Sequence, residues 1–181
     1  IRSFETAFGL QRAAPEAFDL SKESDATLKL YGLQRGETAG FGWQCLVARR
    51  LAERGVRFIE LIDSKHSWDS HSSIKKGMGK AAANVDQASA ALLKDLKARG
   101  MLDETLVVFT TEFGRRPFED GEGPSTAGRG HQPSAFSTWL AGGGVRAGMV
   151  YGKTDDYGAQ VVENPVHVHD LQATILHLLG I

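Results

Sequence analysis

Cysteine is almost absent from this sequence of 181 residues, since Cys45 is the only one. A single thiol excludes an internal disulfide and a zinc site built from cysteines, and it is compatible with either redox environment. The neighbouring Leu46 and Val47 predict that this thiol is buried. Imidazole and carboxylate groups are therefore the metal ligands to consider.

The sequence also has no long apolar run and no block of like charge. A membrane span needs roughly 20 consecutive apolar residues, so none is predicted. Lys and Arg total 21 against 22 for Asp and Glu, and their scatter along the chain predicts no basic surface for nucleic acid. Small molecules are therefore the expected class of ligand.

A signal peptide is missing as well, because no basic, apolar and small-residue segment opens the chain. The sequence starts abruptly within a helical pattern at Ile1 to Leu10, which predicts that it is a fragment of a longer protein. The missing signal is then uninformative about export. With 41% hydrophobic residues, the chain is long enough for a substantial core, and we expect a single domain over residues 1–181.

Apolar periodicity predicts helical structure in four stretches, which are residues 1–33, 41–54, 74–99 and 170–179. In the first stretch, Pro15 is expected to break the helix, and Asp19 or Ser21 to cap a second, short one. The third stretch is the longest, and Gly100 is its expected end. Its apolar stripe consists of Ile74, Met78, Ala81, Ala82, Val85, Ala88, Leu92 and Leu96.

Runs of branched and aromatic residues predict strands at 56–62, 105–110, 135–141 and, with a weaker pattern, 145–151. Because the long helix lies between the first two, we expect a βαβ unit with parallel strands. The predicted fold is a three-layer α/β/α domain with a mostly parallel sheet. Glycines and prolines between residues 115 and 133 predict a long surface loop.

Three polar stretches adjoin these predicted strands, namely Trp68–His71, Thr111–Arg115 and Gly128–His131. Open α/β sheets place their ligands at the edge where the strands end, so the three are expected to meet. Asp69 and His71 lie two residues apart and could present an oxygen and a nitrogen on one side. A carboxylate and two imidazoles form a common zinc ligand set that leaves one position for water or substrate. The alternative is a helix-capping turn before Ser72 and Ser73.

These motifs, with the ending Val166 to Ile181, resemble the DUF1501 family, which is placed within the alkaline phosphatase and sulfatase superfamily. The resemblance covers most of the chain from about Phe41 onward. It implies that this chain is the carboxyl-terminal part of an alkaline-phosphatase-like domain. The members of that superfamily carry their nucleophile after an early strand, so the nucleophile is expected upstream of Ile1, and Cys45 does not match its motif.

The resemblance also implies the roles of individual residues. Asp69, His71 and His131 look like the ligands of one metal, and Glu112 stands where the superfamily has an acidic ligand. Two departures matter, because Phe113 replaces a histidine ligand and Gly130 replaces an aspartate that commonly precedes the second histidine. A site with one metal, or with different ligands, is therefore expected, and the orientation of His131 is expected to be weaker.

Other polar and aromatic residues are weaker candidates. Arg115 could bind an oxyanion through two hydrogen bonds, or it could form an ion pair with Glu112. His167 and His169 form a His-x-His pair for which capping and packing are favoured over metal binding. The remaining candidates are His66 as a residue lining the pocket, His177 as a helix residue, and Trp68 and Trp139 as core aromatics.

The expected function is a metal-dependent hydrolase of phosphate or sulfate esters, with Glu112 as a further ligand or base and Arg115 as the anion-binding group. The alternative is a metal- or ligand-binding protein on the same scaffold whose catalytic groups have degenerated, as Phe113 suggests. Zinc is the expected cofactor, with manganese or calcium as other candidates. The expected partner is a small anionic ester, and the family resemblance implies export to the periplasm or the extracellular space.

Overall fold

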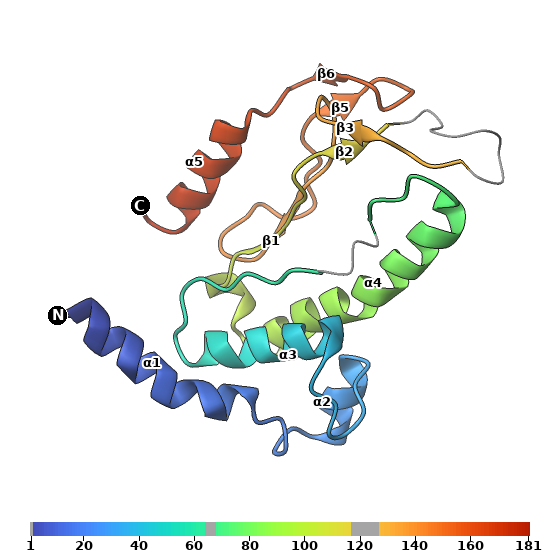
Figure 1. Ribbon diagram of the computed structural model, residues 1–181. Helices are drawn as coiled ribbons and strands as arrows, with labels where there is room; N and C mark the ends of the chain where they lie inside the picture. Colours follow the sequence, from blue (N-terminus) through green and yellow to red (C-terminus); the bar gives the residue numbers. More distant parts are fainter. Residues whose placement is uncertain (1, 64–67, 117–126) are drawn as a thin grey trace. The chain divides into compact units, whose positions relative to one another are not determined.

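The computed structural model describes residues 2–63, 68–116 and 127–181 (Figure 1). The chain divides into two compact units, of which the first is Ile1–Lys65 with Ala82–Ala98, and the second is His66–Ala81 with Arg99–Ile181. The expectation that the whole is part of a larger domain stays a prediction. Among the described helices, none is long and apolar enough to cross a lipid bilayer.

The first unit is helical. Its elements are α1 (Arg2–Phe18), α2 (Asp25–Leu30), α3 (Gly40–Glu53) and the later part of α4 (Ile74–Ala98). The prediction that Pro15 breaks the first helix is wrong, since α1 continues through it to Phe18. A proline removes one backbone donor, but a helix can accommodate that loss.

Ser24 is the N-cap of α2, because its side chain accepts a hydrogen bond of 3.1 Å from the Thr27 backbone N–H. The prediction of Asp19 or Ser21 as the cap is therefore wrong. Asp19 instead accepts a hydrogen bond from the Ser21 backbone N–H within the preceding turn. A capping residue must stand immediately before the first helical turn, and only Ser24 does so.

The core of this unit is formed by α2 and the residues just after it, α3 and α4, and its buried cluster includes Leu28, Tyr31, Leu33, Cys45, Leu46, Ala88 and Ala91. The predicted stripe of α4 is confirmed at Ala81, Val85, Ala88 and Leu96, which are all buried. Ala82 is exposed, so the stripe is narrower than predicted. Burial at steps of three and four residues is the pattern of a helix with one apolar face.

A buried ionic network adjoins this core. The side chain of Arg49 is only 2% exposed and meets carboxylates from three parts of the unit. Its guanidinium nitrogens lie 2.8 Å from Glu23 and 2.7 Å from Glu53. Its Nε lies 3.0 Å from Asp95 Oδ2 as an ion pair without hydrogen-bond geometry.

Two further side chains extend this network. The Tyr31 hydroxyl donates a hydrogen bond of 3.0 Å to Asp95, and the Arg50 guanidinium lies 2.5 Å from Glu23. Burial acts to raise the pKa of Glu23, but the hydrogen bond from Arg50 and the charge of Arg49 outweigh it and hold that pKa below its usual range. The folded unit therefore stabilises the ionised form of Glu23.

Cys45 should be chemically inert in the folded protein. It is 1% exposed, and burial raises the pKa of its thiol to about 12. We expect the native protein at pH 8 to react negligibly with a disulfide reagent such as DTNB over an hour, and the guanidinium-denatured protein to release one thiol equivalent. A native thiol that reacts as fast as free cysteine would contradict the buried position.

Among the described residues, the second unit contains short strands, two α-helical segments and a 3₁₀ turn. Its elements are residues 74–81 of α4, a 3₁₀ turn (Leu102–Glu104), β1 (Val107–Phe109), β2 (Gly114–Arg115), β3 (His131–Gln132), β4 (Trp139–Ala141), β5 (Lys153–Thr154), β6 (Val161–Glu163) and α5 (Val168–Leu178). The strands form three antiparallel pairs, β1 with β4, β2 with β3 and β5 with β6.

The predicted three-layer fold with a mostly parallel sheet is therefore wrong. Of the predicted strands, 105–110 and 135–141 each contain a shorter strand, and these two pair antiparallel as β1 and β4. Residues 56–62 and 145–151 form no strand, and Phe58 is 82% exposed. Branched and aromatic residues favour a strand only where a partner and a buried face exist. Without the first strand, α4 is not a βαβ crossover.

Candidate metal centre

Backbone hydrogen bonds bring the two ligand-bearing segments together within the second unit. The Arg129 N–H donates to the Ser70 carbonyl and the Ile74 N–H to the Ala127 carbonyl, both at 2.9 Å. Gly128, between these two bonds, is buried against the backbone of His71. A Cβ at position 128 would lie 2.0 Å from the His71 carbonyl carbon, so the two segments touch only because residue 128 is glycine.

The β2–β3 pair brings a third segment, residues 114–116, next to the segment that carries His131. Arg115 lies opposite His131 in this antiparallel pair, and the Arg116 N–H donates to the Gly130 carbonyl at 2.9 Å. Sequence reasoning placed residues 115–133 in one long loop, but its two ends are paired strands. Residues 117–126 between them lie outside the described part of the chain. The pairing fixes Arg115 and His131 on neighbouring strands.

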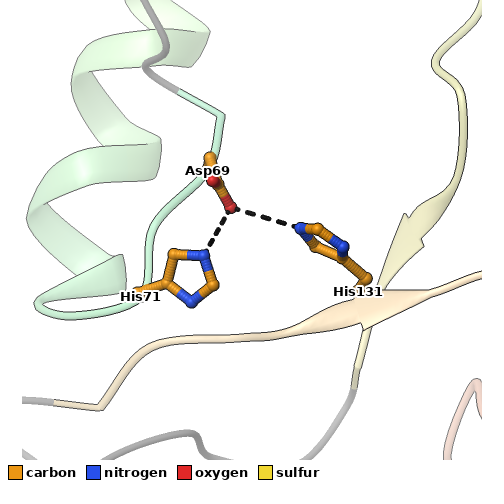
Figure 2. Close-up of side chains that lie close together, drawn as sticks. All are labelled: Asp69, His71 and His131. Atoms are coloured by element: carbon orange, nitrogen blue, oxygen red, sulfur yellow. Dashed lines mark ion pairs between the residues drawn. The ribbon is translucent and has the colours of Figure 1, made fainter.

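Asp69, His71 and His131 form a cluster at this junction (Figure 2). One ligand atom from each lies within 4.8 Å of the other two. Asp69 Oδ1 is 3.0 Å from His71 Nε2 and 3.7 Å from His131 Nε2. Figure 2 shows both imidazole rings turned toward the same carboxylate oxygen. The three residues that the sequence predicted as ligands are thus the three that the structure brings together.

The geometry and chemistry of these donors fit a divalent cation. In a tetrahedral zinc site with bonds of about 2.1 Å, ligand atoms lie about 3.4 Å apart. The two distances to Asp69 Oδ1 lie on either side of that value. The His71 and His131 side chains are 61% and 51% exposed, so small rotations can close the remaining gap. One oxygen and two nitrogen donors would leave a position open for water or substrate.

Arg115 is a fourth member of the site. Its Nη1 donates a hydrogen bond of 2.6 Å to Asp69 Oδ1, which sequence reasoning did not foresee. This hydrogen bond, with the neighbouring charges of His71, Arg115 and His131, holds the pKa of Asp69 below its usual range. The ion pair with Glu112, which was one of two alternatives for Arg115, is replaced by an ion pair with Asp69.

Glu112 is not part of the three-residue cluster. Its carboxylate accepts a hydrogen bond of 2.8 Å from the Thr111 hydroxyl. Its own backbone N–H and that hydroxyl hold the pKa of Glu112 below its usual range. A carboxylate with a lowered pKa is a weak proton acceptor at neutral pH. Glu112 therefore suits charge stabilisation better than general base catalysis, and the structure does not place it among the metal ligands.

Phe113 packs against the site instead of ligating in it. Its ring centroid lies 4.1 Å from that of His131, and the Arg115 Cζ lies 5.4 Å from its centroid. The ring therefore contacts both a ligand and the arginine. This packing supplies orientation to His131 that Gly130, which has no side chain, cannot supply.

The remaining candidates lie elsewhere. His167 is the N-cap of α5 and forms a capping box with Asp170, which confirms the capping role predicted for it. His169 donates its backbone N–H to the His167 ring. Trp139 stacks on Phe109 at 5.3 Å between β4 and β1 and is 38% exposed. His66 lies outside the described residues.

Comparison with known proteins identifies a family. The model of a family described as "Protein of unknown function (DUF1501)" matches residues 1–181. No curated protein and no solved structure matches the chain.

Proposed function

The chain belongs to the DUF1501 family, and on that premise we propose that it is a metal-dependent hydrolase of phosphate or sulfate esters. The observation that carries this proposal is the approach of Asp69, His71 and His131, whose ligand atoms all lie within 4.8 Å of one another. An oxygen and two imidazole nitrogens suit zinc best, and manganese is a second candidate. Calcium prefers an all-oxygen set, so this ligand set does not favour it.

A bound cation would polarise the ester and acidify a coordinated water or hydroxyl. The protein residues would hold the cation and bind the anionic group of the ester. Asp69 is ionised under neutral conditions and offers its carboxylate to the cation, while the two imidazoles complete the ligand set. Arg115 offers a planar guanidinium with five donors that can bind two oxygens of a phosphate or sulfate. Glu112 carries a negative charge near this arginine.

The alkaline phosphatase and sulfatase superfamily would supply the remaining parts of this proposal. By resemblance to that superfamily, we propose that the nucleophile follows an early strand and that the protein is exported. The antiparallel strand pairs of this structure do not support the superfamily's sheet, so the proposal depends on the site residues alone.

A second function is favoured by Phe113. Its ring lies 4.1 Å from His131, in the position where a nitrogen ligand was expected by resemblance, and carbon cannot coordinate a metal. A site with one cation and no second ion suits a metal- or anion-binding protein as well as an enzyme. Turnover of aryl phosphate and aryl sulfate by the protein would separate the two, because the binding protein would show no metal-dependent turnover.

Metal content tests the site directly. After reconstitution with zinc and removal of excess metal, we expect the protein to hold one equivalent by elemental analysis. Asp69→Ala and His131→Ala are expected to lose at least about 90% of it, because either change removes a donor of the set. Asp156→Ala and His177→Ala remove the same chemical groups at exposed positions outside the site and should keep the full equivalent.

Two outcomes of this experiment would contradict the proposed metal site. Full metal content in Asp69→Ala and His131→Ala would overturn the ligand assignment. Equal loss in all four variants would show that metal content does not depend on the cluster. Circular dichroism of each variant distinguishes the loss of a ligand from the loss of the fold.

A further inference from the structure

Nitrogen atoms of three side chains lie close to one carboxylate oxygen of the site. Asp69 Oδ1 lies 2.6 Å from Arg115 Nη1, 3.0 Å from His71 Nε2 and 3.7 Å from His131 Nε2. A metal cation bound at the site would contact this oxygen and a nitrogen of each imidazole. The guanidinium is itself a cation, and it already has the shortest contact.

Arg115 is held in this position by more than the ion pair. Its backbone lies opposite His131 in the β2–β3 pair, and its side chain is 22% exposed, compared with 44% for Asp69. The Phe113 ring lies 5.4 Å from the Arg115 Cζ and 4.1 Å from the His131 ring. Cation–π contact and strand pairing thus keep the guanidinium at the edge of the ligand cluster.

A guanidinium keeps its charge throughout the physiological pH range. A divalent ion bound between the three ligands would lie within a few ångströms of it. The repulsion between one and two positive charges at about 5 Å, in a largely solvated site, weakens cation binding roughly tenfold. Arg115 therefore competes with the metal for the same oxygen.

An oxyanion can relieve this competition. Phosphate and sulfate form paired hydrogen bonds with a guanidinium, and their charge offsets that of the arginine. An anion bound to the guanidinium would compete with Asp69 for its donors and would offset its positive charge. Anion binding would thus weaken the hold of Arg115 on Asp69 Oδ1 and reduce the repulsion.

We propose that Arg115 couples the two ligands of this site, so that a tetrahedral oxyanion bound to Arg115 raises the affinity of Asp69, His71 and His131 for a divalent cation. The coupling is reciprocal, so a bound cation raises the affinity for the oxyanion by the same factor. This inference depends on the proposed metal site and adds how the cation and the anion bound there affect each other's affinity. The class of substrate whose binding would be strengthened is a tetrahedral oxyanion or its ester.

Cobalt(II) and sulfate test the coupling, because cobalt reports its coordination in the visible spectrum and its sulfate is soluble. We expect 10 mM sulfate to tighten the cobalt dissociation constant of the native protein by about three- to tenfold, at an ionic strength kept constant with sodium chloride. Arg115→Gln keeps a hydrogen-bond donor but loses the charge. It should bind cobalt about tenfold tighter than the native protein without sulfate and respond to sulfate less than twofold.

Two controls sharpen the comparison. Arg146→Gln makes the same charge change at an exposed arginine outside the site and should keep the native affinity and the native sulfate response. Arg115→Lys keeps the positive charge and should keep part of the sulfate response. Complexation of cobalt by sulfate in solution affects every protein equally and cancels in the ratio.

The outcomes separate this inference from the metal site itself. If the native protein binds no cobalt with or without sulfate, the metal site and the coupling both fail. If it binds one equivalent but sulfate has no effect, the metal site stands and the coupling is overturned. Weaker cobalt binding by Arg115→Gln would also overturn it, because Arg115 would then hold Asp69 in place for the metal rather than compete with it.

Discussion

Replacing Arg49 with alanine is expected to lower the free energy of unfolding by about 3–5 kcal/mol. The Arg49 side chain is 2% exposed and lies between the carboxylates of Glu23, Glu53 and Asp95. Without the guanidinium, the negative carboxylates lie close together in a poorly solvated place. The attraction to Arg49 that offset the cost of burying them is then lost. Loss of one partner from a buried ion pair is much costlier than loss of an exposed one.

Urea unfolding followed by circular dichroism measures this effect. Arg146→Ala is the matched control, since it truncates an exposed arginine and should change stability by no more than about 0.5 kcal/mol. Equal stability of Arg49→Ala and the native protein would show that the network does not hold the first unit together.

The same variant should show a distinct dependence on pH. The folded pKa of Glu23 is lowered, so its contribution is fully present above its unfolded value, near 4.5, and is lost as the pH falls through the lower folded value. The native protein should therefore lose stability more steeply than Arg49→Ala as the pH falls below about 4.5.

Gly128→Ala is expected to weaken cation binding at least tenfold, roughly as much as loss of an essential supporting group around a metal ligand. The added Cβ would lie 2.0 Å from the His71 carbonyl carbon, 2.1 Å from its oxygen and 2.6 Å from its Cα. All three are backbone atoms, so no side-chain rotation relieves the clash. The segment that carries His71 has to move away from the one that carries His131.

Cobalt titration of this variant gives the measurement, and Gly79→Ala is the matched control. Gly79 lies within α4, and a Cβ there meets no atom within 4 Å. The control should keep the native cation affinity and gain helix stability. Native affinity in Gly128→Ala would mean that the close approach of the two segments is not needed to assemble the ligands.

The helices were predictable from the sequence because each carries its own periodic signal. Ala81, Val85 and Ala88 recur at helical spacing, and burial follows that spacing in the structure. The failure at Pro15 has a local reason, since the sequence shows the lost donor but not whether neighbouring contacts sustain the helix.

The strands were less predictable, because a strand depends on a partner that can lie far away in the sequence. The residues of β1 and β4 were identified as strands, but their antiparallel pairing was not. Residues 56–62 have a strand-like composition and form none. Composition reports how well a residue fits a pleated surface and carries no information about whether that surface is formed.

The three proposed ligands were identified by their chemistry, although the reason given for their meeting was wrong. No parallel sheet edge gathers them in the described residues. Backbone hydrogen bonds from Arg129 and Ile74 and the small size of Gly128 do so. The glycines on both sides of Arg129 were a visible signal of close backbone approach. The contact between Arg115 and Asp69 had no such signal, because both lie on separate segments.

The positions of the ligands along the chain give the proposed cation a mechanical role. Asp69 and His71 precede α4, whereas His131 lies on β3, after the whole of that helix and the first two strands. A cation held by all three would close a long loop of chain, as a disulfide does, in a sequence whose single cysteine cannot form one internally. Metal availability would then set how firmly the second unit is cross-linked, and a chelator would act on it as a reducing agent acts on a disulfide-bonded protein.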